Sequence, residues 1–266
     1  MAAEKSLALV LRVVEFSETS CIVTLFTEDF GKIGALAKGA RRKKSPFESA
    51  LDLLAICRVV FLPKSGDSLA LLTEAKLERR FRAAEQDLSR LYCGYYIGEL
   101  IQELTDLHDP HPDLFRGADM VLQDLDGRGQ GAAPASLVLW FELTALRILG
   151  HAPELDQCVG CGIDLRNDKR FAFGMLSGGL LCPKCRPGKR SVVSVSSEGV
   201  ETLRRFAASP SPLEAGDVPE RNRGEIRGVT SHYLAHLLGH RLRMDTYLGF
   251  LAGRATAGER TATGQA

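Results

Sequence analysis

The chain has 266 residues, of which 45% are hydrophobic and 25% charged, a composition typical of a globular protein with about one to three domains. Its formal net charge is +1, so nucleic-acid binding would have to come from a local basic patch rather than from an overall positive charge. No apolar run approaches the length of a membrane span, and the N-terminus lacks the apolar core of a signal peptide. We therefore expect a cytoplasmic protein without membrane contact, whose cysteines are thiols or metal ligands.

The first part of the chain is predicted to form a series of short strands. Apolar, β-rich segments separated by turns rich in Gly, Asp and Ser cover residues 7–14, 20–27, 31–38, 50–62 and 68–76. This pattern predicts an antiparallel barrel or sandwich. Five strands in roughly seventy residues match an OB-fold barrel, which commonly binds nucleic acid, although an SH3-like barrel fits nearly as well by strand count.

A basic loop follows the third of these strands. Four cations stand in a row and a fifth lies just before them, with no acid between Gly31 and Phe47. A run of this density between two strands favours a loop that contacts phosphates over a merely solvated loop. The candidate residues are Lys38, Arg41, Arg42, Lys43 and Lys44. Bases could stack on Phe16, Phe26 or Phe47, of which one or more is expected to lie in the core.

A second basic cluster, Arg79-Arg-Phe-Arg82, follows the last of these strands, and we also assign its Arg79 and Arg80 to DNA binding. Apolar residues recur at helical spacing after this cluster. Helices are predicted at residues 84–107, 114–125, 135–149, 197–208 and 222–242, with breaks at Pro and Gly. From residue 252 onward the chain lacks an apolar period, which predicts a disordered tail. The domain boundaries expected from these changes are 1–79, 80–154, 155–190, 191–251 and 252–266.

Two CxxC pairs interrupt the helical pattern at Cys158, Cys161, Cys182 and Cys185. Two thiolates at this spacing can chelate one tetrahedral ion from a tight turn, and the intervening residues, which suit a small hairpin at 170–181, allow the pairs to converge. We therefore predict one structural zinc ion per chain in a four-cysteine knuckle. Redox dithiols or packing cysteines are the alternatives, which two matched pairs make less favourable.

Other groups of possible ligands have simpler interpretations. His232, His236 and His240 recur every four residues, but they lack the acid of a metalloprotease motif and fit a polar helix face. The acids and histidines between Asp106 and Asp113 fit a turn between two helices. No phosphate-binding glycine motif or nucleophile elbow is present, so the residues themselves indicate a binding protein rather than an enzyme.

The order of these parts resembles the RecO family, the bacterial recombination mediators of the RecF pathway. The resemblance is carried by Thr24-Leu-Phe-Thr27, Phe30-Gly-Lys32 and Lys38-Gly-Ala-Arg-Arg42, and later by His232-Tyr-Leu and His236-Leu-Leu-Gly239. It extends to about residue 251. The four cysteines support it without defining it, because many but not all members have them.

The resemblance implies an α+β protein with an N-terminal OB-fold barrel, an α-helical domain and an inserted four-cysteine zinc knuckle. It implies binding of single- and double-stranded DNA, strand annealing, and loading of RecA onto DNA coated by the single-strand-binding protein (SSB). RecR and the acidic C-terminal tail of SSB are the implied partners, and RecA an indirect one, in the bacterial cytoplasm at the nucleoid. The alternatives are a zinc-containing nuclease with a metal site at the Asp106–Asp113 turn, and a protein-interaction scaffold.

Overall fold

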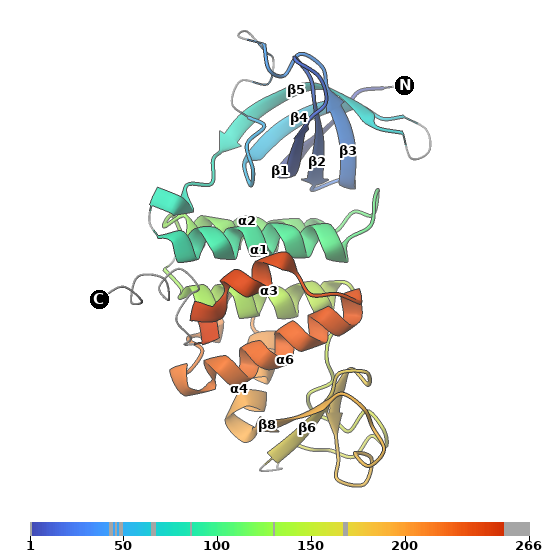
Figure 1. Cartoon of the computed structure of the whole chain (residues 1–266), viewed down its shortest axis with the longest axis vertical. Coiled ribbons are helices and arrows are strands. Elements are labelled where there is room, and N and C mark those ends of the chain that lie inside the picture. Colours follow the sequence, from blue (N-terminus) through green and yellow to red (C-terminus); the bar gives the residue numbers. More distant parts are fainter. Residues whose placement is uncertain are drawn as a thin grey trace, which may run out of the picture. The chain divides into compact units, whose positions relative to one another are not determined.

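The computed structural model describes residues 2–42, 45, 47, 50–64, 68–85, 87–129, 131–166 and 170–252. Lys43 and Lys44 of the basic loop, and residues 253–266 of the predicted tail, lie outside these described residues. The chain forms two compact units, residues 1–129 and residues 130–266. Figure 1 labels helices and strands of both units. No helix in the described ranges combines the length and the apolar character needed to cross a membrane.

The first unit begins with a closed five-stranded barrel. Its strands are β1 (Glu4–Glu15), β2 (Cys21–Thr27), β3 (Gly31–Ala37), β4 (Ile56–Leu62) and β5 (Ala70–Arg79). They are ordered β1-β2-β3-β5-β4, and β1 pairs with β4 to close the barrel. All neighbours are antiparallel except β3 and β5, which run parallel. This Greek-key connection is the OB-fold, so strand order decides between the two barrels that strand count leaves open.

Side chains alternate between the inner and outer faces along β3 and most of β2, which sets the barrel interior. Cys21, Val23 and Leu25 point inward opposite Ala37, Ala35 and Ile33. Alanines on β3 and β5 keep the interior narrow enough for a small barrel to close around packed side chains. The predicted fourth strand starts only at Ile56, because residues 50–55 form turns, of which Ala50 and Ala55 belong to the barrel core and Leu54 lies against Gly94 and Gly98.

The same unit contains η1 (Ala83–Glu85), α1 (Leu88–Leu104) and α2 (Pro112–Leu125). α1 contacts β1 and α2 contacts β2, and the two helices pack on each other (Figure 1). Two glycines one turn apart on α1 make room for the barrel. A β-carbon on Gly94 would lie 2.3 Å from the Phe81 ring, and one on Gly98 would lie 2.8 Å from Leu54.

Lys32 of β3 ties the barrel to the end of α1. Its ammonium donates to the carbonyl of Gln102 at 2.6 Å and to that of Thr105, which are among the carbonyls that a helix C-terminus leaves unsatisfied. Burial lowers the pKa of Lys32, while Asp106 and Glu103 oppose this shift. The segment Phe30-Gly-Lys32 therefore has a structural role in joining the barrel to the turn between α1 and α2.

Gly31→Ala should destabilise the protein far more than Gly39→Ala. Both glycines have positive φ, 66° and 72°, so each substitution incurs the cost of about 1 kcal/mol for a left-handed backbone. A β-carbon on Gly31 would also lie 2.2 Å from the backbone oxygen of Asp109, whereas on Gly39 it would meet nothing closer than the Arg42 side chain at 3.4 Å. Urea unfolding should show an additional loss of about 1–3 kcal/mol for Gly31→Ala. Equal losses in the two variants would contradict this close packing.

The second unit is built around α3 (Pro134–Ile148), in which residues 136–146 are all buried. Around it lie α4 (Ser197–Ala208), α5 (Pro212–Ala215), α6 (Glu220–Leu238), η2 (Arg243–Tyr247) and η3 (Gly249–Ala252). A three-stranded antiparallel sheet joins β6 (Arg170–Gly174) to β7 (Gly179–Leu181) and β8 (Val192–Ser196), with β6 in the centre. Figure 1 labels β6 and β8. The predicted hairpin at residues 170–181 is confirmed, and β8 is an addition to it.

Candidate nucleic-acid interface and metal centre

The basic loop starts where β3 ends and is held against the turn between β1 and β2. Gly39 turns the chain, and the Arg42 N–H donates to its carbonyl at 3.1 Å. The Arg41 N–H donates to the Thr19 carbonyl at 3.1 Å, and the Gly39 N–H donates to the Ser20 hydroxyl at 3.4 Å. These bonds fix the backbone of the loop, so its cations emerge from a defined position.

Lys38, Arg41 and Arg42 all expose their side chains to solvent. Arg41 is 3.0 Å from a Glu15 oxygen, but the two side chains are 44% and 73% exposed. An ion pair this exposed contributes little and is easily exchanged for another anion. The structure thus brings these three predicted cations together on one loop, where they are accessible to a phosphate backbone.

One aromatic ring lies at the turn that supports this loop. Phe16 is 63% exposed and precedes Ser17–Ser20, whereas Phe26 and Phe47 are in the barrel core at 0% and 3% exposure. The Phe16 N–H bonds to the Ser20 carbonyl, so the ring is carried by the same turn that holds Arg41. Of the three aromatics considered from the sequence, Phe16 alone offers a free face to a base.

The second basic cluster has a different environment. The Arg79 guanidinium pairs with Asp119 of α2, and its side chain is only 15% exposed. Burial lowers the pKa of Arg79, and the neighbouring Asp119 partly offsets this. The Nε of Arg80 is buried and has no hydrogen-bond partner among the described atoms. Arg79 is thus engaged in the fold, and the contribution of these two arginines to DNA binding stays a prediction.

The four cysteines of the two CxxC pairs converge at the end of the small sheet. Their sulfur atoms all lie within 4.8 Å of one another, and the Cys161 and Cys182 sulfurs are 3.7 Å apart. Four sulfurs at about 2.3 Å from a tetrahedral ion would be about 3.8 Å apart, so this donor set fits such an ion. In the part of the chain that the structure describes, no other group of His, Cys, Asp and Glu meets this criterion.

The surroundings of these sulfur atoms change the pKa values of the thiols in a way that favours cation binding. Burial alone would raise the pKa of Cys158, but backbone N–H donors from Cys182, Gly160 and Cys161 outweigh it and lower the pKa to about 6. The other three thiols raise the pKa of Cys185 to about 12. Four thiolates at this spacing repel one another, and a bound divalent cation would offset that repulsion. Gly160 leaves room for Cys185, which would lie 3.0 Å from an added β-carbon.

The helices of the second unit hold this knuckle in place. Arg204 of α4 donates to the Leu155 carbonyl at 2.9 and 2.6 Å and pairs with Asp156. Tyr233 of α6 donates to the His151 carbonyl at 3.0 Å, and its ring meets Phe173 of β6 edge-on. Tyr233, from the His232-Tyr-Leu motif, therefore has a packing role in anchoring the sheet.

The remaining candidate ligands serve local structure. His232 Nδ1 donates to the Gly228 carbonyl at 2.6 Å, and its Nε2 accepts from Arg241 at 3.3 Å. In the turn between α1 and α2, His111 bonds Asp109 at 2.9 Å, and in the first turns of α2, Arg116 bonds Asp113 at 2.5 Å. These partners agree with the interpretation of both segments as structural.

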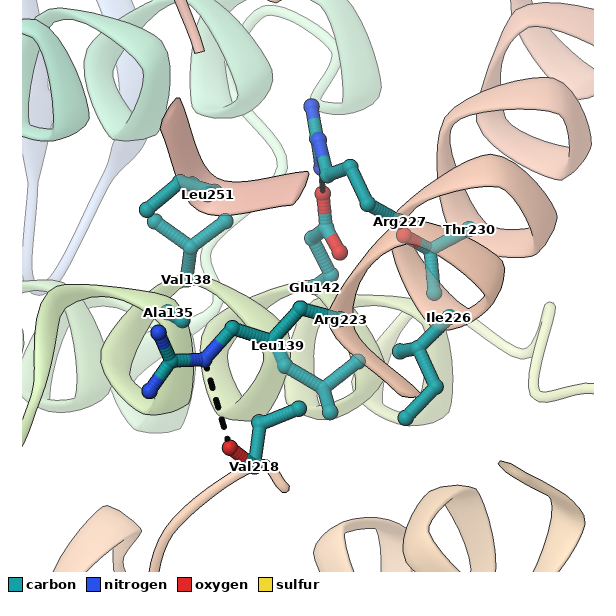
Figure 2. Close-up of a pocket in the computed structure, with 10 residues that line it drawn as sticks. All are labelled: Ala135, Val138, Leu139, Glu142, Val218, Arg223, Ile226, Arg227, Thr230 and Leu251. Carbon is teal, nitrogen blue, oxygen red and sulfur yellow. Dashed lines mark hydrogen bonds and ion pairs between the residues drawn. The ribbon is translucent and has the colours of Figure 1, made fainter. Parts of the chain in front are cut away.

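A pocket opens between α3 and α6 of the second unit, and Figure 2 shows its lining. Its walls are mainly apolar, and it is bordered by Glu142, Arg223, Arg227 and Thr230. Arg227 pairs with Glu142 and Asp245, whereas the Arg223 Nε donates to the Val218 carbonyl at 3.3 Å. The Thr230 hydroxyl is buried with no hydrogen-bond partner in the described structure. No sequence pattern indicates this pocket, because its residues come from distant segments.

Comparison with known proteins gives consistent matches over most of the chain. Residues 1–81 match the family model described as Recombination protein O N terminal, and residues 85–245 match Recombination protein O C terminal. The DNA repair protein RecO of Rhodopirellula baltica is 46% identical, over 91% of this chain and 97% of its own. That of Myxococcus xanthus is 36% identical, over 91% of this chain and 95% of its own. These descriptions name repair and recombination and no chemical reaction.

Proposed function

The chain belongs to the RecO family of DNA repair proteins, and we propose that it is a recombination mediator in the RecF pathway that anneals complementary strands and helps to load RecA onto SSB-coated single-stranded DNA. The observation that carries this proposal is the basic loop on an OB-fold barrel, with three exposed cations beside an exposed aromatic ring. Lys43 and Lys44 are the remaining cations of the proposed DNA-binding loop. We also include Arg79 and Arg80 among the proposed DNA-binding residues.

Annealing requires two polyanions to approach each other, and neutralising cations lower the repulsion between them. The loop would contact phosphates, while Phe16 would stack on a base without reading sequence. No covalent step is needed, so we propose that the protein acts without catalysis. The nuclease alternative would need metal-binding carboxylates at the Asp106–Asp113 turn, where Asp109 and Asp113 instead pair with His111 and Arg116.

We further propose that the four cysteines hold one structural Zn²⁺ ion per chain. The four-thiol donor set suits zinc, and the closed coordination shell leaves no position for a substrate. The ion would fix the two turns of the knuckle relative to each other. We also propose the domain division 1–79, 80–154, 155–190 and 191–251, with RecR and SSB as partners in the bacterial cytoplasm at the nucleoid.

Annealing of complementary strands coated with the cognate SSB tests the proposed function. The wild-type protein should accelerate duplex formation well above the rate of SSB-coated strands alone, and adding RecR and RecA should then yield RecA filaments on the single strand. Unchanged annealing on both bare and coated strands would overturn the proposal. Cleavage of a labelled strand with Mg²⁺ would support the nuclease, and partner capture without DNA binding would support a scaffold.

Phe16→Ala should weaken single-strand binding by about 1–3 kcal/mol without loss of stability, because the exposed ring contributes to stacking rather than to the core. Phe16→Trp should retain or improve affinity, since it preserves a stacking face. Fluorescence anisotropy on an oligothymidylate and a thermal melt of each variant provide the two measurements. Equal affinity of the wild type and the alanine variant would remove Phe16 from the interface.

The pocket between α3 and α6 is our proposed site for the acidic C-terminal tail of SSB. Apolar walls suit an apolar side chain, and Arg223 with the unpartnered Thr230 hydroxyl suits a neighbouring carboxylate. Arg223→Ala should weaken binding of a labelled tail peptide about tenfold, through loss of a charge-assisted hydrogen bond. Thr230→Val should also weaken it while leaving the free protein equally stable, because the shape is kept. Arg221→Ala, a charge-matched change on the same helix, should have no effect.

A further inference from the structure

The second half of the knuckle and the strand that follows it carry positive charge alone. Residues 170–197 contain five lysines and arginines and no aspartate or glutamate. Every one of the five is exposed in the structure. They are Arg170 on β6 and Lys184, Arg186, Lys189 and Arg190 in and after the second CxxC pair.

Among the residues that the structure describes, three acids close to the knuckle in sequence already have partners. Asp156 pairs with Arg204, and Asp164 pairs with Arg166. A carboxylate oxygen of Glu154 accepts the backbone N–H groups of Asp156 and Gln157 at 2.8 and 3.0 Å. Within the described ranges, none of the five knuckle cations forms an ion pair with any carboxylate. Their charge is therefore available to an external anion.

A bound metal ion and its four thiolates would neutralise only part of this positive charge. A divalent ion with four thiolates has a formal charge of about −2, which Lys184 and Arg186, beside the ligand Cys185, would balance. Lys189 and Arg190 lie further along the chain, with Arg170 on β6, and these three remain in excess. Neutralising the negative charge of the metal centre thus accounts for some of these cations and leaves the others unexplained.

The backbone holds these cations in defined positions. The Arg186 N–H donates to the Cys182 carbonyl at 3.0 Å, and the Lys189 N–H donates to the Arg186 carbonyl at 3.2 Å. The next turn closes at Ser191, which has a positive φ of 54° and accepts the Met175 N–H at 3.0 Å. The cations therefore belong to consecutive tight turns that start from a metal-ligand residue.

We infer that the four-cysteine knuckle is a second DNA-backbone-binding surface, in which Lys189 and Arg190 contact phosphates and Lys184 and Arg186 border them. Long cations on surface turns contact phosphates without reading sequence, which suits a polyphosphate strand. This inference rests on the proposed function and extends it. Each of the two compact units would then carry one phosphate-binding surface, so a single chain could hold two strands at once.

Lys189→Ala with Arg190→Ala tests this surface, because neither residue lies inside a CxxC pair. The double variant should keep its full metal content, bind single-stranded DNA with a log–log salt slope lower by about 0.7 for each phosphate no longer neutralised, and anneal several-fold more slowly. Combined with alanines at Lys38, Arg41 and Arg42, it should bind more weakly than either set alone. Arg166→Ala with Arg221→Ala removes the same charge from paired arginines of the same unit and should change neither property.

The possible failures are distinguishable. If the wild-type protein neither binds DNA nor anneals strands, the proposed function fails. If the wild type does both and the knuckle variant matches it in affinity, salt slope and annealing rate, the knuckle surface alone is overturned. Loss of binding to an acidic SSB-tail peptide with unchanged DNA binding would overturn it too, because it would show that the cations serve a protein partner.

Discussion

Replacing Lys38, Arg41 and Arg42 together with alanine should weaken single-stranded DNA binding about 100-fold at 0.1 M salt. Each phosphate contact to a single strand contributes about 0.7 to the log–log salt slope, which corresponds to about fivefold per contact at this salt concentration. The three side chains are exposed, and the ion pair between Arg41 and Glu15 is too exposed to hold the loop. Anisotropy titrations at several salt concentrations should show the slope falling by about 2, with thermal stability unchanged.

A charge-matched control separates this contact from general electrostatics. Lys5, Arg58 and Lys76 are exposed cations on β1, β4 and β5 of the same barrel, and replacing all three removes the same charge. That variant should lose little affinity, since long-range attraction is largely screened at 0.1 M salt. If both triple variants lose the same affinity and slope, the loop has no special role and only the net charge matters.

Cys182→Ser should abolish metal binding and unfold the knuckle. Structural zinc sites provide about 10–16 kcal/mol of apparent binding free energy in small zinc-binding peptides, and losing one of four thiolates removes most of it. Protein purified under reducing conditions should contain about one zinc per wild-type chain and almost none in the variant. Hydrogen exchange should accelerate in β6, β7 and β8, which lie beside Cys182 and its neighbours, while β1–β5 stay protected.

The control for the metal prediction is Cys21→Ala, which removes a buried barrel cysteine that lies outside the four-thiol group. This variant should keep its zinc and lose only the stability of a small core truncation, about 1 kcal/mol. A strong chelator should convert the wild type to the exchange pattern of Cys182→Ser. Full knuckle protection in metal-free, reduced protein would show that the sheet and the helices hold this region without an ion.

Much of the fold is predictable because it depends on local patterns. Strand alternation predicts the barrel strands, and the helix-breaking residues predict the helix limits to within a few residues. The prediction of a strand over residues 50–55 is wrong because the segment forms turns in which only Ala50, Leu54 and Ala55 are buried, and an apolar composition does not distinguish such turns from a strand. Strand β8, Val192–Ser196, is rich in β-branched valine, but it is short and its partner β6 is more than fifteen residues away, so its place in the sheet depends on a non-local pairing.

The candidate sites likewise separate into features that local sequence patterns predict and features that depend on contacts between distant segments. The spacing of the four cysteines and the density of the basic loop are visible in the sequence because their chemistry depends on neighbours along the chain. Pairing of Arg79 with Asp119 and the lone hydroxyl of Thr230 depend on distant segments meeting, which no local pattern encodes. The sequence also does not distinguish Phe16 from Phe26, although one ring lies at the surface and the other in the core.

The parallel pairing of β3 with β5 has a consequence for the order of folding. Closing the barrel joins segments far apart in the chain, because β1 must meet β4 and β3 must meet β5 across the basic loop and the β4–β5 hairpin. Contacts between distant segments form slowly, whereas the β1–β2–β3 meander is made of neighbouring strands. Phe16 lies in the β1–β2 turn of that meander, and Arg41 follows directly after β3 and bonds to the same turn. The proposed DNA-binding surface is thus encoded in the part of the barrel that can fold first, and barrel closure then fixes it in place.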